Sequence, residues 1–100
     1  MARAAAELAE KGEGRCAVSG ALTFETAPWL WQQLQEGAWL TRAREADLSG
    51  VTTADSAGLA LLIAWRAAAL AGGGALKFGA VPERLLALAR LTDAEALLQA

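Results

Sequence analysis

The sequence of 100 residues contains no histidine, and this absence excludes several kinds of active site. Histidine is the commonest general base and metal ligand, and it titrates near pH 7 without help from its surroundings. Serine–histidine and cysteine–histidine nucleophiles are therefore excluded, as are the usual zinc sites, which need several cysteine or histidine ligands. We expect no enzyme activity, no metal, no cofactor and no small-molecule substrate.

Cysteine occurs only once, at Cys16, so the chain cannot form an internal disulfide. The cysteine content therefore gives no indication of an oxidising compartment. Cys16 lies in an apolar stretch, and a free cysteine usually behaves as a small buried hydrophobe. We predict a buried structural thiol.

Clustered charge and long apolar runs are also missing. The net charge is −2, and the nine basic residues form no stripe along the sequence, so we expect no nucleic-acid partner. Residues 1–7 lack the apolar core of a secretory signal. The most apolar stretch, residues 59–71, contains Arg66 and as a helix would reach about 20 Å, short of the ~30 Å hydrocarbon layer. We predict a cytoplasmic protein that does not insert into a membrane.

Turn signals divide the rest of the chain into alternating strands and helices. We predict strands over residues 5–10, 15–22, 44–51 and 75–80, and helices over residues 27–40, 57–71, 82–91 and 94–99. Gly37 is a candidate end of the first helix, or a point where its last turn loosens. This alternation is typical of a mostly parallel sheet with helices packed on it. Residues 5–10 are ambiguous, because alanine and glutamate favour a helix whereas pairing with residues 15–22 would make a hairpin. Because the sequence has no repeats and no long linker, we expect residues 1–100 to form a single domain.

The most informative segment is residues 47–62. A strand ends at Asp47-Leu48, a polar loop follows, and a helix begins at Asp55-Ser56. The Asp55 or Ser56 side chain can accept hydrogen bonds from the unpaired N–H groups of the first helical turn. Gly58 lets another backbone approach that turn closely. Because no second carboxylate lies at a suggestive spacing, we interpret Asp55 as a helix cap rather than a catalytic group.

This segment resembles the STAS domain family, named for sulfate transporters and anti-sigma-factor antagonists. The family pattern is a strand ending in Asp-Leu-Ser, followed by Asp-Ser-Ser-Gly-Leu at a helix start. Asp47-Leu48-Ser49 and Asp55-Ser56-Ala57-Gly58-Leu59 match it at the right separation. The resemblance implies an α/β STAS fold with a mostly parallel sheet of four to five strands and helices mainly on one face.

One departure separates two functional branches of that family. In bacterial anti-sigma-factor antagonists the second serine of Asp-Ser-Ser-Gly is phosphorylated, and here that position is Ala57. Ser56 remains a candidate phosphorylation site, although the first serine is not the usual acceptor in the family. A signalling module that binds an anti-sigma-factor kinase is therefore the alternative function.

The segment Asp55–Leu62 is more similar to the Asp-Thr-Gly-Gly-Leu-Ala-Leu-Leu run of MlaB-type proteins, the STAS subunits of the Mla phospholipid transporter. Pro28-Trp29-Leu30 resembles their Leu-Pro-Leu-Trp segment, and residues 85–91 resemble their Tyr-Thr-Leu-Ala-Lys-Leu. The resemblance implies a cytosolic subunit bound to the MlaF-type ABC ATPase of the transporter. That complex moves phospholipid and maintains outer-membrane lipid asymmetry.

The helix over residues 57–71 carries apolar residues on almost every side. One stripe must pack on the sheet, and the second must meet either a neighbouring helix or a partner. The resemblance favours a partner, and the predicted partner-binding residues are Asp55, Ser56, Gly58, Leu59, Leu61 and Trp65. Because Trp29 and Trp31 cannot both face the sheet, we place Trp29 in the core and Trp31 at the surface or an interface.

Overall fold

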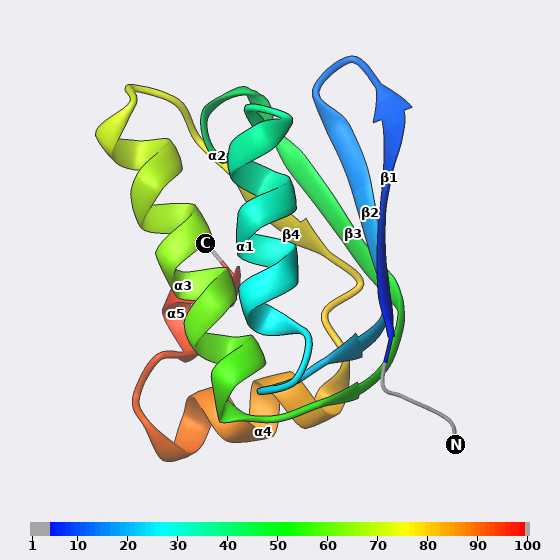
Figure 1. The fold of residues 1–100 in the computed structure, drawn as a ribbon. Coiled ribbons are helices and arrows are strands. Elements are labelled where there is room, and N and C mark those ends of the chain that lie inside the picture. The colour runs from blue at the N-terminus through cyan, green and yellow to red at the C-terminus, as the bar shows by residue number, and fades with distance from the viewer. Residues whose placement is uncertain (1–4, 100) are drawn as a thin grey trace.

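Strands and helices alternate along residues 5–99, the part of the chain that the computed structural model describes (Figure 1). The strands are β1 (Ala6–Gly12), β2 (Arg15–Leu22), β3 (Glu45–Ala54) and β4 (Lys77–Gly79). The helices are α1 (Ala27–Glu36), α2 (Trp39–Arg42), α3 (Ser56–Ala71), α4 (Glu83–Leu91) and α5 (Glu95–Gln99). The order of elements is the predicted one with an additional helix, α2. β3 continues to Ala54, which corrects the prediction that the strand ends at Asp47-Leu48.

The four strands form one mixed sheet in the order β1-β2-β3-β4. β1 pairs with β2 antiparallel, whereas β2 with β3 and β3 with β4 are parallel. Cys16, Ala46 and Phe78 lie side by side in this register. The predicted mostly parallel α/β sheet is therefore confirmed, at the lower of the two expected strand numbers.

The ambiguous first segment is a strand. β1 is rich in alanine and glutamate, yet it pairs along its length with β2, and the two are joined by a tight turn at Glu13-Gly14. Glu13 and Gly14 both have positive φ, at 56° and 78°. Pairing with a strand that already faces the core outweighs the weak helix preference of these residues.

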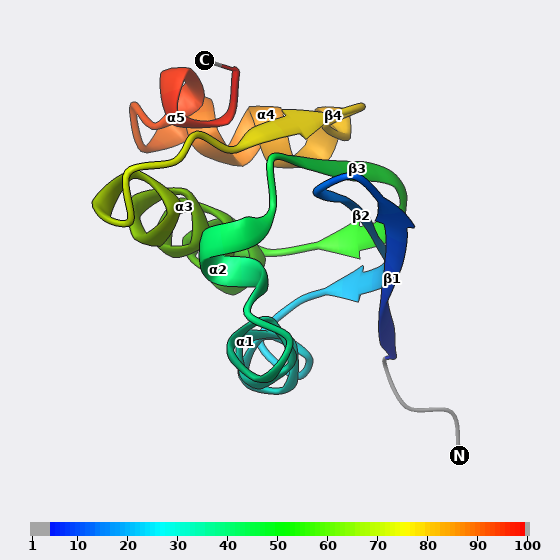
Figure 2. The same cartoon turned by 90° about the horizontal axis from the view of Figure 1, so that it is seen from above.

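Helices cover one face of the sheet. Figure 2 shows α1, α2 and α3 together on one side, with α4 and α5 beside β4. Residues of the opposite face are exposed or half-buried in the described part of the chain: Arg15, Ala17, Ser19, Glu45, Asp47, Ser49 and Lys77. The predicted placement of helices mainly on one face is confirmed.

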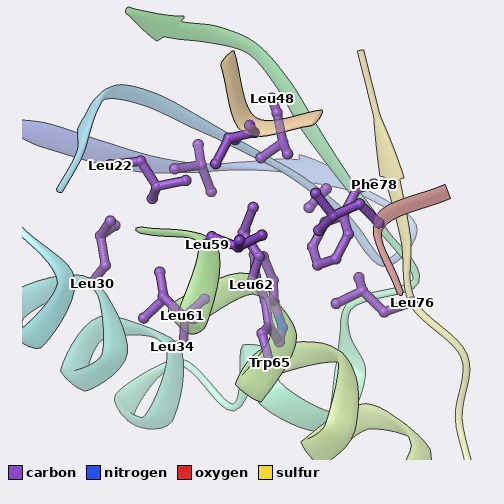
Figure 3. Packing of buried hydrophobic residues seen from close by; sticks show 14 of the residues in the cluster. Leu22, Leu30, Leu34, Leu48, Leu59, Leu61, Leu62, Trp65, Leu76 and Phe78 are labelled. Atoms are coloured by element: carbon purple, nitrogen blue, oxygen red, sulfur yellow. The ribbon is translucent and has the colours of Figure 1, made fainter. Parts of the chain in front are cut away.

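The core lies between that covered face and the helices (Figure 3). The sheet contributes Val18, Leu22, Leu48 and Phe78, and they meet leucines of α1 together with Leu59, Leu61, Leu62 and Trp65 of α3. Cys16 is also buried, which confirms the structural thiol, and burial raises its pKa to about 11.

The segment expected to be helical over residues 27–40 contains two helices, and Gly37 ends the first of them, as one of the two sequence alternatives predicts. α1 ends at Glu36, and Ala38 adopts a left-handed conformation with φ 59° before α2 begins. This break turns the chain so that Trp39 is buried, whereas Trp29 is 44 % exposed. The prediction that Trp29 lies in the core is therefore wrong, while Trp31 is half-buried against the core.

Candidate partner-binding surface

Asp55 organises the turn that leads into α3. Its Oδ1 atom accepts hydrogen bonds from the N–H groups of Ala57 (2.9 Å) and Gly58 (3.2 Å). Its Oδ2 atom accepts a third from the N–H of Phe24 (3.0 Å), in the loop between β2 and α1. These donors, that of Phe24 foremost, hold the pKa of Asp55 below its ordinary value. The predicted helix cap is confirmed, and the same carboxylate also ties two loops together.

Gly58 allows the close approach that the sequence predicts, but the approaching backbone belongs to this chain. A Cβ atom at Gly58 would collide with the carbonyl oxygen of Leu22, at the end of β2. Gly58 is buried as a result. It is a packing residue between α3 and the sheet, and this corrects its predicted place on a partner-binding face.

The larger predicted partner residues of α3 are interior as well. Leu59, Leu61 and Trp65 are only 4 %, 7 % and 0 % exposed. The Trp65 Nε1 atom donates to the carbonyl oxygen of Trp39 (3.0 Å), and its ring meets the Phe78 ring edge-on at 5.9 Å. The neighbouring helices and the sheet cover Leu59 and Trp65, and this corrects the prediction that these two side chains face another protein. Leu61 is buried as well, although one edge of it reaches the surface.

The surface beside the Asp55 turn is nevertheless open and apolar. A groove of about 410 Å³ runs between the first halves of α1 and α3, and we call it the α1–α3 groove. Its lining includes Phe24, Pro28, Trp31, Ala57, Ala60 and Ala64. Phe24 is 78 % exposed, whereas Leu61 also lines the groove but is buried. Of the predicted partner residues, Ser56 is exposed and Asp55 is half-buried next to this groove.

Two features of the groove escaped the sequence interpretation although the sequence holds a signal for each. Phe24 is a lone aromatic residue in the polar loop Thr23-Phe24-Glu25, where no core is expected. Ala57, Ala60 and Ala64 recur at helical spacing and form the outward face of α3, which the larger leucines obscure. Small outward residues keep the groove open.

Other kinds of site are not seen in the described part of the chain. Among residues 5–99, no group of three or more cysteine, aspartate or glutamate side chains could hold a metal ion. No helix in this range is long and apolar enough to span a membrane.

The mixed sheet, the helices on one face and the Asp55 turn together define a STAS domain. The family model described as Mlab, STAS domain matches residues 6–99, so the chain belongs to this family. A search of the curated proteins found no match. The resemblance seen in the sequence is thereby confirmed at the level of the family.

Proposed function

We propose that this STAS domain is a cytoplasmic, non-catalytic subunit that binds and stabilises the ABC ATPase of a phospholipid transporter. It associates with the inner membrane only through that complex, which maintains outer-membrane lipid asymmetry. The Mlab family match supports the class of partner. The open α1–α3 groove beside the Asp55 turn is the observation on which the docking proposal rests.

The groove has the properties of a docking surface. An aromatic side chain that is 78 % exposed, as Phe24 is, contributes roughly 1.5–3 kcal/mol when a partner buries it. Phe24, Pro28 and Trp31 come from the α1 side and the small alanines from α3, so a protruding apolar side chain of the partner fits between them. Aromatic anchors of this kind dominate the energetics of protein interfaces.

Binding through this groove acts on the ATPase by mass action. A subunit that binds the folded or active form of its partner, and not the others, raises the population of that form. Ala57 lines the groove at the position where signalling relatives carry the phosphorylated serine. Without a hydroxyl at this position the surface cannot be switched there by phosphorylation, and the association is constitutive.

Co-purification with an MlaF-type ABC ATPase from the same organism tests the proposal. In Ala60→Arg a long charged side chain is placed in the groove from a position that is exposed in the free domain, so the fold is expected to survive. We expect the wild type to retain the ATPase and Ala60→Arg to lose at least about tenfold in affinity. Leu91→Arg is the matched control, because Leu91 is 83 % exposed on α4 and does not line the groove.

Equal loss in both variants, or full retention by Ala60→Arg with an unchanged melting temperature, would contradict the proposed groove. Absence of any complex with the wild type would contradict the proposed partner.

The alternative, an anti-sigma-factor antagonist, is favoured by a single observation, the exposure of Ser56 at the start of α3. It predicts phosphate transfer from a kinase-type anti-sigma factor. Stoichiometric labelling that disappears in Ser56→Ala would establish the signalling function, whereas an unlabelled chain leaves the transporter function standing.

A further inference from the structure

Cationic side chains that are scattered in the sequence gather at the end of the molecule opposite the α1–α3 groove. In Figure 1 this end holds α2 and the turn between α3 and β4, whereas the first turns of α1 and α3 lie at the other end. A hollow of about 580 Å³ lies here, and we call it the cationic hollow. Its lining includes Thr41, Arg42, Arg44, Gly74 and Lys77, and it contains no carboxylate.

Arg42 is held in place by three contacts. Its Nε atom donates to the carbonyl oxygen of Gly37 (2.9 Å), and its guanidinium lies 3.8 Å from the centre of the Trp39 ring. The third contact is an ion pair with Glu10 at 3.6 Å between two exposed side chains. Such an exposed pair contributes only about 0–1 kcal/mol, so an incoming anion can displace Glu10 while the other two contacts keep the guanidinium positioned.

Arg44 and Lys77 form no ion pair within residues 5–99, although Glu45 lies beside Lys77 in the β3–β4 register. Neither side chain makes a hydrogen bond within this range. The Arg44 stem lies against Gly14, where a Cβ atom would be 3.1 Å from Arg44 Cγ, and the backbone N–H of Arg44 donates to the Gly14 carbonyl oxygen (2.7 Å). The Lys77 N–H donates to the Arg44 carbonyl oxygen (2.9 Å), which keeps the two residues adjacent.

Gly74 lines the hollow without contributing a side chain, and Gly72 packs close by. Gly72 lies so close to Thr41 that a Cβ atom would be 3.2 Å from its methyl carbon. Within the described part of the chain, three carboxylates border the site. Glu13 lines a neighbouring hollow together with Gly14, Arg42 and Arg44. Glu10 pairs with Arg42, and Glu45 is the cross-strand neighbour of Lys77. The opening between the two arginines and Lys77 therefore stays accessible to a small anion.

From this geometry we infer that the cationic hollow binds a phosphate group. Three like charges around one opening repel each other, and a multiply charged oxyanion relieves that repulsion. Planar guanidinium groups offer paired N–H donors that match phosphate oxygens, and the lysine adds a flexible third cation. The phosphate belongs either to a soluble phosphate ester or to a lipid headgroup. This inference does not depend on the proposed function, because the two surfaces lie at opposite ends of the domain.

A titration followed by amide NMR tests this inference on the full chain. Glycerol 3-phosphate is added to the ¹⁵N-labelled protein at constant ionic strength, with chloride as the reference salt. We expect shifts confined to residues 41–44 and 72–77. Arg44→Gln should weaken binding about tenfold or more, whereas Arg90→Gln, which removes the same charge from an exposed arginine on α4, should leave it unchanged.

A second arm separates the two sources of phosphate. Co-sedimentation with vesicles that contain phosphatidic acid, compared with vesicles of phosphatidylcholine alone, shows whether a lipid headgroup binds. If Arg44→Gln abolishes this binding, the cationic hollow is the binding site and the phosphate belongs to a lipid headgroup. The inference is overturned if neither source binds, if Arg90→Gln weakens binding as much as Arg44→Gln, or if an acidic peptide of equal charge binds more tightly than the phosphate compounds.

Discussion

At the scale of single residues, Asp55 does more than its sequence position alone indicates. Capping requires only the acceptance of N–H groups from the first turn of α3, which Oδ1 provides. The bond from the Phe24 N–H to Oδ2 additionally connects α3 to the loop that carries the most exposed aromatic side chain of the groove. A carboxylate has enough acceptor positions for all three donors, and a serine or threonine at this position would have only one oxygen.

We expect Asp55→Ala to destabilise the domain by about 1–2 kcal/mol at pH 7, as the loss of a helix cap does. The pKa of Asp55 is lowered by folding, so its stabilisation is present above the ordinary carboxyl pKa and is lost as the pH falls through the lowered value. The difference between variant and wild type should therefore shrink below about pH 4. Urea unfolding of both proteins at neutral and acidic pH measures this difference in the free energy of unfolding.

Glu25→Ala is the control, because Glu25 is an exposed carboxylate in the same loop. A difference between Asp55→Ala and wild type that stays constant with pH, or an equal loss in Glu25→Ala, would contradict this role for Asp55.

At the scale of elements, α3 is an interior helix that reaches the surface along one narrow strip. Its leucines and Trp65 pack on the sheet and on the neighbouring helices, and its exposed residues beside the groove are alanines. Close packing against β2 depends on Gly58, since the helix axis can approach the Leu22 carbonyl only without a side chain there. The position of the groove relative to the sheet follows from this contact.

We therefore expect Gly58→Ala to destabilise the domain by at least about 2 kcal/mol, because overpacking against backbone outweighs the ~1 kcal/mol by which alanine favours a helix. Gly74→Ala is the matched control, since a Cβ atom there meets only ordinary contacts at 3.6 Å or more. Thermal or chemical unfolding of both variants checks the prediction, and equal stability of the two would show that the contact with Leu22 relaxes at little cost.

At the scale of the whole molecule, the α1–α3 groove and the cationic hollow lie at opposite ends of the domain, with the hydrophobic core between them. The α1–α3 groove is apolar and lies at the start of α3, and the cationic hollow lies at its end. Leu61 marks the boundary between interior and surface, because it is 7 % exposed yet lines the groove. A variant at such a position changes stability and binding together, whereas a variant at Phe24 separates the two.

The contrast between Leu61→Ala and Phe24→Ala makes this division measurable. We expect Leu61→Ala to lose about 2–4 kcal/mol of unfolding free energy, as buried leucines do, and Phe24→Ala to stay within about 0.5 kcal/mol of wild type. Partner affinity should fall in Phe24→Ala with the stability unchanged. Chemical unfolding and a binding titration are compared on the same samples, and a large stability loss in Phe24→Ala would place that ring in the core instead.

Much of the fold follows from local sequence signals. The order of elements, the buried Cys16, the cap at Asp55 and the close approach at Gly58 were all predictable, because each depends on neighbouring residues or on a short motif. The predictions that were wrong concern which side chains face the core and which face the surface. Trp29 is exposed because α1 buries its Leu30 and Leu34 face, and Trp65 is buried because α3 packs on more than one side.

The sequence by itself determined the class of fold, the Asp55 turn and the absence of a hydroxyl at Ala57, since these are properties of single residues and short segments. Only the tertiary structure decided that Phe24 and three alanines share one groove, and that Arg42, Arg44 and Lys77 surround one hollow. The physical reason is that both surfaces join segments far apart along the chain. Their meeting depends on strand register and helix packing, which no local pattern specifies.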